Sequence, residues 1–285
     1  SEMCIRDSFT ILHLKNYSCY NAFGDIMLYK KDILSLLRHC GIQPTDTVLI
    51  HSGLRAIGPM EGNAEGLLEV LTDYLSEGLL IFPTHTWAFM TQDYAVFDAD
   101  KTPSCVGTLS NIARKTPGFL RSMHPTHSVC ACGPRAKWYV DHDLTASTPV
   151  GVKNCFGILT DLDAKILFLG APLSKNTFIH SIEEEMNVPD RFTPHIYHFL
   201  SQSKTQSLEY AMPRHYSTLS AHISEHYEKL LPIFLKKKIA KEFLFGNAIS
   251  YMVYAKPCHT LVRDILTKDL HAFDSFKDIS HLCDL

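Results

Sequence analysis

The stretch from Thr47 to Gly58 is TVLIHSGLRAIG, and it decides the fold. Its first four residues are β-branched or apolar, which is typical of a short buried strand. The glycines that follow indicate a turn, and residues 64–75 then carry apolar side chains at helical spacing. A second apolar run, Leu79 to Phe82, ends at Pro83. Strand, turn, helix and strand in this order predict a βαβ unit and therefore a parallel or mixed sheet with helices on its faces.

The rest of the chain continues the alternation of helices and strands. Expected helices cover residues 29–40, 106–115, 178–187, 225–238 with a break near Pro232, and 258–270. Expected strands cover residues 128–131, 165–169 and 243–255. Residues 191–218 are aromatic and polar without a clear period, so they receive no assignment. The sequence therefore predicts an α/β fold built on one main sheet.

Composition excludes several classes of protein. The chain of 285 residues is 46% hydrophobic and 20% charged, which suffices for one sizeable core. The net charge is -3 without a long Lys/Arg block, so the charge pattern of a nucleic-acid-binding protein is absent. No apolar run approaches the roughly 20 residues of a membrane span, and no secretory signal is evident. We therefore expect a cytoplasmic protein without a nucleic-acid or membrane partner.

Nine cysteines are scattered along the chain without CxxC spacing. This pattern argues against a disulfide framework and against a zinc ribbon. Cys130 and Cys132 alternate along an expected strand and share one face, where buried packing is favoured over metal binding.

The first candidate for chemistry is NTFIHSIEEE, residues 176–185. On a helix, His180 and Glu183 share one face, and a carboxylate beside an imidazole fixes its tautomer and raises its basicity. Such a histidine can take the proton from an attacking amine. The alternative interpretation is an ordinary surface His–Glu pair. The HExxH motif of zinc proteases is absent.

Two further segments could bind a ligand. The turn from His51 to Gly58 follows a strand and can present backbone N–H groups to a phosphate or an oxyanion, although an ordinary βα loop would look the same. The segment RSMHPTHS, residues 121–128, offers an arginine and a hydroxyl just before a strand. Its two histidines are weak indications of a metal. A serine hydrolase acting through Ser52 or Ser128 lacks the GxSxG elbow.

Taken in this order, the segments resemble the antibiotic (aminoglycoside 3-N-) acetyltransferase family. The family motif His-Ser/Ala-Ser-Leu-Arg-x-hydrophobic-Gly corresponds to His51–Gly58, and Arg-Ser-x-His-Pro-x-x-Ser corresponds to Arg121–Ser128. The Asn-x-x-x-His-x-x-Glu helix corresponds to Asn176–Glu183. The resemblance covers about residues 28–270.

The resemblance implies a three-layer α-β-α sandwich with a central mixed sheet, acetyl-CoA as acetyl donor, and no metal. It implies His180 as the general base and Glu183 as its orienting partner. The residues that it implies for coenzyme binding are His51, Ser52, Gly53, Leu54, Arg55, Gly58, Arg121, Ser128 and Val129.

The implied function is an acyltransferase that acetylates an amine of an aminoglycoside, at the 3-N position, or of a related amino sugar, and could confer antibiotic resistance. The chain departs from the family at Gly53, where a second serine is usual, and residues 191–238 lack the acidic stretch that would hold a polycation. Candidate carboxylates for that purpose are Glu184, Glu185, Asp93, Asp98 and Asp100, although the favoured interpretation of these residues is solvated surface charge. N-acetylation of a nucleotide-linked amino sugar in surface-polysaccharide synthesis, and a non-catalytic coenzyme A-binding homologue, remain open alternatives.

The division of the chain follows from the same resemblance. Residues 1–24 have no counterpart in the family and are interpreted as an N-terminal extension whose native origin is left open. Residues 25–285 are expected to form a single acetyltransferase domain, with residues 191–240 as an elaboration on the acceptor side. The expected partner is a small-molecule amine, and a homodimer is left open.

Overall fold

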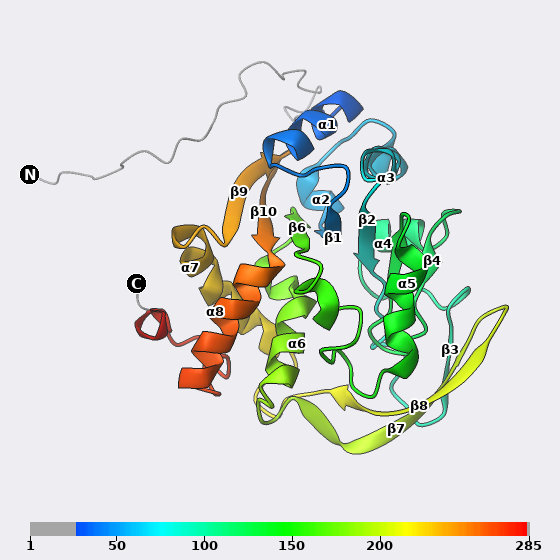
Figure 1. The fold of residues 1–285 in the computed structure, drawn as a ribbon, viewed down its shortest axis with the longest axis vertical. Coiled ribbons are helices and arrows are strands. Elements are labelled where there is room, and N and C mark those ends of the chain that lie inside the picture. Colours follow the sequence, from blue (N-terminus) through cyan, green and yellow to red (C-terminus); the bar gives the residue numbers. More distant parts are fainter. Residues whose placement is uncertain (1–26, 284–285) are drawn as a thin grey trace, which may run out of the picture.

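A seven-stranded mixed sheet organises the protein in the computed structural model, which describes residues 27–283 (Figure 1). The strands of this sheet are β1 (Thr47–Ser52), β2 (Leu79–Pro83), β4 (Leu120–Arg121), β5 (Val129–Cys132), β6 (Lys165–Leu169), β9 (Ala240–Phe245) and β10 (Ala248–Tyr254). They lie in the order β4-β5-β2-β1-β6-β10-β9, so β1 is central. β1 pairs in parallel with β2 and β6, whereas β10 runs antiparallel to β6 and β9. The predicted mixed sheet is confirmed.

Helices cover both faces of this sheet. One face carries α1 (Lys30–His39), α2 (Leu54–Ile57), α3 (Asn63–Tyr74) and α4 (Thr108–Ala113). The other face carries α5 (Ala136–Val140), α6 (Thr177–Glu185), α7 (Leu231–Lys236) and α8 (Ala255–Lys268). Successive side chains of a strand point to opposite faces. Accordingly Val48 and Ile50 pack into the first core and Leu49 into the second. The expected three-layer sandwich is therefore present.

Residues 191–218, which received no assignment from the sequence, include a long hairpin. β7 (Phe192–Gln202) and β8 (Ser207–His215) pair antiparallel, and β3 (Ala95–Asp98) joins β7 to complete a second, three-stranded sheet. The hairpin curves along one edge of the molecule in Figure 1. Most residues of β7 are exposed or half-buried, so the strand lacks the buried apolar run that marks a strand in a sequence.

Two expectations near the end of the chain need correction. Residues 243–255 form two strands, β9 and β10, and not one. The chain reverses at Gly246 and Asn247, and Gly246 adopts φ +60, which favours glycine. The final helix begins at Ala255, three residues earlier than predicted. The predicted break near Pro232 is confirmed, because a 3₁₀ helix, Ile223–Leu230, ends there and Pro232 lies in the first turn of α7.

Other expectations concern features outside this sheet. Residues 1–24 lie outside the described residues. Cys130 is buried in the core and Cys132 is half-buried, as expected of packing residues. Within residues 27–283, none of the helices combines the length and apolar character needed to cross a bilayer.

Candidate active site

A pocket opens where the carboxyl ends of the three parallel strands meet, which is the usual ligand position in open α/β sheets. β1 contributes His51 and Ser52, β2 contributes Pro83, and the segment after β6 contributes Ala171. Helix α6 and the end of β8 line the opposite wall. The residues of that wall include Thr177, His180, Arg214 and His215.

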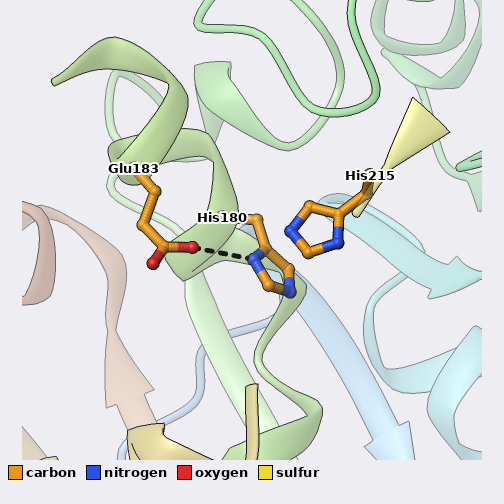
Figure 2. Close-up of side chains that lie close together, drawn as sticks. All are labelled: His180, Glu183 and His215. Atoms are coloured by element: carbon orange, nitrogen blue, oxygen red, sulfur yellow. Dashed lines mark hydrogen bonds and ion pairs between the residues drawn. The ribbon is translucent and has the colours of Figure 1, made fainter. Parts of the chain in front are cut away.

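His180 and Glu183 form a buried pair one turn apart on α6 (Figure 2). Nδ1 of His180 lies 2.9 Å from Oε2 of Glu183, and their side chains are only 11% and 1% exposed. The interpretation of a surface ion pair is therefore wrong, and the contact predicted from the spacing is confirmed. His180 lines the pocket, and Glu183 lies buried behind it.

Three donors hold the carboxylate of Glu183. Nδ1 of His180 and the hydroxyl of Tyr227 both contact Oε2, and Nε of Arg191 donates to Oε1 at 2.8 Å. Arg191 is itself buried and also pairs with Asp274 at 2.8 Å. Burial alone would raise the pKa of Glu183, but the bond and charge of His180 and the charge of Arg191 outweigh it and lower the pKa to about 2. Glu183 is therefore ionised at neutral pH.

An ionised acceptor fixes the tautomer of His180. Nδ1 carries the proton that faces Glu183, so Nε2 holds the lone pair. His180 lines the pocket, and a ring in this tautomer can accept a proton from a bound ligand. The arrangement suits general-base chemistry.

His215 lies against the other side of the His180 ring (Figure 2). The ring centroids are 4.0 Å apart. Burial lowers the pKa of His215 well below its usual value, and the charge of His180 lowers it further, so this ring is neutral. Ligand atoms of His180, Glu183 and His215 lie within 4.8 Å of one another and could hold a metal ion. The contacts already made by both oxygens of Glu183 favour a hydrogen-bonded His–Glu pair over metal ligation.

The turn after β1 joins this pocket to a second, shallower one. Ser52 and Gly107 line both. The second pocket is also lined by Gly53, Leu54, Arg55, Ala56 and Thr108. A Cβ at Gly53 would lie 2.2 Å from the carbonyl oxygen of Gly170, so the close approach of the two chains requires glycine there. This explains why the chain carries glycine in place of serine.

His51 lines the main pocket next to Ser52. Its ring stacks on Phe168 with centroids 5.0 Å apart. Burial, followed by the charge of Lys175, lowers the pKa of His51 to about 3, so the ring is neutral. Its buried Nε2 has no partner among residues 27–283.

The sequence profile described as aminoglycoside 3-N-acetyltransferase matches residues 49–267. The chain belongs to the aminoglycoside 3-N-acetyltransferase family. The match includes most of β1, both pockets and the His180–Glu183 pair, so the resemblance drawn from the motifs is confirmed.

Curated members of the family match over part of their length. Aminoglycoside N(3)-acetyltransferase III from Salmonella sp is 28% identical over 184 residues, which cover 57% of this chain and 62% of that protein. The aminoglycoside N(3')-acetyltransferase-like protein YokD of Bacillus subtilis (strain 168) is 26% identical over 176 residues, covering 54% of this chain and 64% of that protein. The matches therefore span less than two thirds of these relatives.

Solved structures of the family share the fold. A structure described as AAC-IIIb binary with CoASH has a TM-score of 0.74 at 20% identity and covers 85% of this chain and 97% of that one. A mutant of AAC(3)-IVa in complex with apramycin has a TM-score of 0.72 at 21% identity, with coverages of 86% and 95%. At this identity the likeness establishes the three-layer fold.

Of the nine residues expected to contact the coenzyme, five line a pocket. His51, Ser52, Gly53, Leu54 and Arg55 line one or both pockets. Four residues do not, and these are Gly58, Arg121, Ser128 and Val129.

Arg121 is occupied by contacts within the protein. Its guanidinium donates to the carbonyl oxygens of Thr84, at 2.7 Å, and Thr102, at 2.6 Å, and it lies over the ring of Phe97. Burial lowers the pKa of Arg121 to about 9. The hydroxyl of Ser128 is fully buried and donates to Thr84 O at 2.8 Å. These contacts favour a structural role for Arg121 over phosphate binding, and they remove Ser128 from the candidate nucleophiles.

Several residues of the site were not predicted from the sequence. Tyr227 and Arg191 support Glu183 from 44 and 8 positions away, and Arg214 and His215 reach the pocket from the unassigned hairpin. No local spacing connects these residues to the family helix. The neutral histidine His85 also lines the pocket and was not singled out, and His127, considered only as a weak indication of a metal, lines it too.

Proposed function

We propose that this protein is a coenzyme-A-dependent N-acetyltransferase that acetylates an amine of an amino sugar or aminocyclitol, with His180 as the general base. One observation carries the proposal: His180, backed by the buried carboxylate of Glu183, lines the pocket that begins at the turn after β1. Relatives named aminoglycoside N(3)-acetyltransferase, and neighbours with CoASH or apramycin, support the reaction class.

The residues present fit a coenzyme that carries a thioester. The second pocket, whose lining includes Ser52, Gly53 and Thr108, adjoins the main pocket and offers space for part of the coenzyme. Gly53 has no side chain, so the chain passes close to Gly170 there. His51, which lines the main pocket next to Ser52, has a buried Nε2 without a hydrogen-bond partner in the described chain. We propose that His51, Ser52, Gly53, Leu54 and Arg55 contact the coenzyme. Bound acetyl-CoA supplies an activated acetyl group.

The proposed reaction is a direct transfer. Nε2 of His180 removes the proton of the attacking amine while the C–N bond forms, and ionised Glu183 stabilises the imidazolium through Nδ1. Backbone N–H groups of the turn after β1 stabilise the negative charge on the thioester oxygen, an effect worth several kcal/mol in such sites. As the C–S bond breaks, His180 returns the proton to the leaving thiolate.

A covalent route through cysteine is disfavoured. Cys105 lines the pocket, but burial raises the pKa of its thiol, so little thiolate is present at neutral pH. A thioesterase that uses Ser52 is the second candidate, since Ser52 lines both pockets.

The test is an acetyl-CoA assay across amino sugars and aminoglycosides, with thiol release and N-acetylated product measured together. The proposal expects thiol release that depends on an added amine and matches the N-acetyl product one to one. Ser52→Ala is expected to keep this activity. Amine-independent thiol release that Ser52→Ala abolishes would establish the thioesterase instead. Tight binding of coenzyme A with no transfer to any amine would establish a non-catalytic binding protein.

A further inference from the structure

The charged side chains that line the main pocket are all basic. They are Lys175 and Arg214, and the lining residues include neither aspartate nor glutamate. Glu183 lies behind His180, where its charge is balanced by Arg191. The pocket wall therefore presents positive charge to a bound molecule.

The five carboxylates named as candidates for binding a polycationic acceptor make other contacts within the protein. Asp93 pairs with His195, and Glu185 pairs with His259 and Arg263. Asp98 contacts Lys101, and Asp100 accepts from the backbone N–H of Lys204 at 2.9 Å. Glu184 accepts from the backbone N–H of Val150. None of these five acidic residues lines either pocket.

Four of the six histidines that line the pocket are held neutral. Burial lowers the pKa of His51 to about 3 and holds the pKa values of His85, His127 and His215 well below the usual value. These rings are neutral at pH 7 and offer hydrogen bonds instead of charge.

Arg214 is an arginine without a carboxylate partner among residues 27–283. Its NH2 group donates to the carbonyl oxygen of Trp87 at 3.0 Å, and its guanidinium lies over the ring of Tyr197. Its Nε is buried and has no hydrogen-bond partner in the described chain. A fixed guanidinium with unused donors is a typical receptor for carboxylate or phosphate oxygens.

Arg214 lies on the part of the main pocket that holds the proposed base, and it does not line the second pocket. Arg214 precedes His215, whose ring contacts His180, and both come from the end of β8. Lys175, by contrast, exerts its charge on His51, which lines the main pocket next to Ser52. Trp87, 44% exposed, adds an apolar surface next to Arg214.

Resting on the proposed function, we infer that the acceptor is a primary amine that also carries an anionic group, phosphate or carboxylate, and that Arg214 binds this group. A polycationic aminoglycoside would place several positive charges beside Arg214 and Lys175 without a carboxylate to offset them. An anionic acceptor instead gains charge-assisted hydrogen bonds from the unused donors of Arg214.

The test measures steady-state acetyl transfer to four matched amines: glucosamine, glucosamine 6-phosphate, muramic acid and kanamycin. The inference expects a KM at least about tenfold lower for the phosphate or the carboxylate sugar than for glucosamine, with kanamycin the poorest acceptor. The two anionic sugars distinguish phosphate from carboxylate recognition. Equal or better use of kanamycin would overturn the inference.

Variants of Arg214 distinguish binding of the anionic group from a general loss of structure or activity. Arg214→Ala is expected to raise KM for the anionic acceptor about tenfold more than it raises KM for glucosamine, and Arg214→Lys should restore part of the difference. Arg263→Ala, on the exposed face of α8, is the control. An equal change for all acceptors would overturn the role of Arg214.

A failure of the proposed function can be distinguished from a failure of the inference about Arg214. If no amine is acetylated, calorimetry of the coenzyme A-loaded protein with glucosamine 6-phosphate, muramic acid and glucosamine still tests the inference. Binding of an anionic sugar that Arg214→Ala abolishes would support the anion site. Binding of none of them, or binding that is insensitive to Arg214→Ala, would overturn it.

Discussion

The hydroxyl of Tyr227 lies 2.6 Å from Nδ1 of His180 and also donates a hydrogen bond to the carboxylate of Glu183. Burial, together with the charge of Glu183, raises the pKa of Tyr227 well above its usual value, so the hydroxyl remains a donor. Tyr227 comes from the 3₁₀ helix before α7, and His180 comes from α6. The contact fixes both members of the His–Glu pair from a separate element.

Tyr227→Phe is therefore expected to lower kcat about tenfold, because one donor to the carboxylate is lost while the fold keeps the ring. KM for acetyl-CoA should stay constant, and the acid limb of the kcat/KM pH profile should shift. The matched control is Tyr210→Phe, which removes another buried hydroxyl, one that donates to Asp143 O at 3.0 Å. Equal effects of the two substitutions, with no shift of the pH profile, would contradict a positioning role for Tyr227.

Glu183→Gln keeps the size of the side chain but removes its charge. The amide can donate to Nδ1, which favours the tautomer with the proton on Nε2, and that tautomer cannot act as a base. We expect kcat to fall by about two to four orders of magnitude. Because Arg191 loses its buried partner, the free energy of unfolding should fall by about 3 kcal/mol. Urea unfolding and initial rates check both effects, and unchanged turnover would contradict the assignment of Glu183.

Glu184→Gln, one residue further on, is expected to act in the opposite direction on stability. Burial raises the pKa of Glu184 to about 7, whereas the unfolded chain ionises near 4.5. Between these values the folded state holds a proton that the unfolded state has released, so this contribution to stability is present at low pH and lost as pH rises through 7. At pH 8 the variant should be more stable than the natural protein by no more than about 3 kcal/mol. Urea unfolding at pH 4.5 and pH 8 should show the difference only at the higher pH.

The buried histidines predict that the protein loses stability in mild acid. Four rings in the pocket, those of His51, His85, His127 and His215, are held neutral because burial lowers their pKa values. The unfolded chain takes up these protons near pH 6.5, so stability falls as pH decreases below that value, by about 1.4 kcal/mol per pH unit for each ring that stays neutral. The raised pKa of Glu184 gives its contribution to stability the opposite pH dependence, but this is one group against four histidines. Urea unfolding between pH 7 and pH 5.5 checks it, and constant stability over that range would show that these rings are already protonated in the folded protein.

The sequence predicted those features that depend on local spacing. Strand β6 has the predicted bounds, 165–169, and the contact between His180 and Glu183 follows from their separation by one helical turn. Tyr227 and Arg214 were missed because tertiary packing alone brings them to the pocket. The hairpin of β7 and β8 was missed because much of it is solvent-exposed.

Motif residues also differed in how far the sequence could assign them. Ser52 and Arg121 belong to motifs of similar appearance, yet Ser52 lines both pockets while Arg121 is held by carbonyl oxygens. Burial separates these two cases, and burial depends on the complete fold. A motif therefore locates a segment, and the packing around it decides whether its polar side chains face a ligand.

The central claim is that Nε2 of His180 takes the proton of the amine in the pocket. The most direct measurement compares the single-turnover rate of acetyl transfer in the natural protein and in His180→Ala, with coenzyme A binding measured by calorimetry in both. Loss of a general base is expected to lower the rate by at least about two orders of magnitude, while the Kd for coenzyme A remains nearly constant. A His180→Ala protein that transfers acetyl at the full rate would contradict the claim.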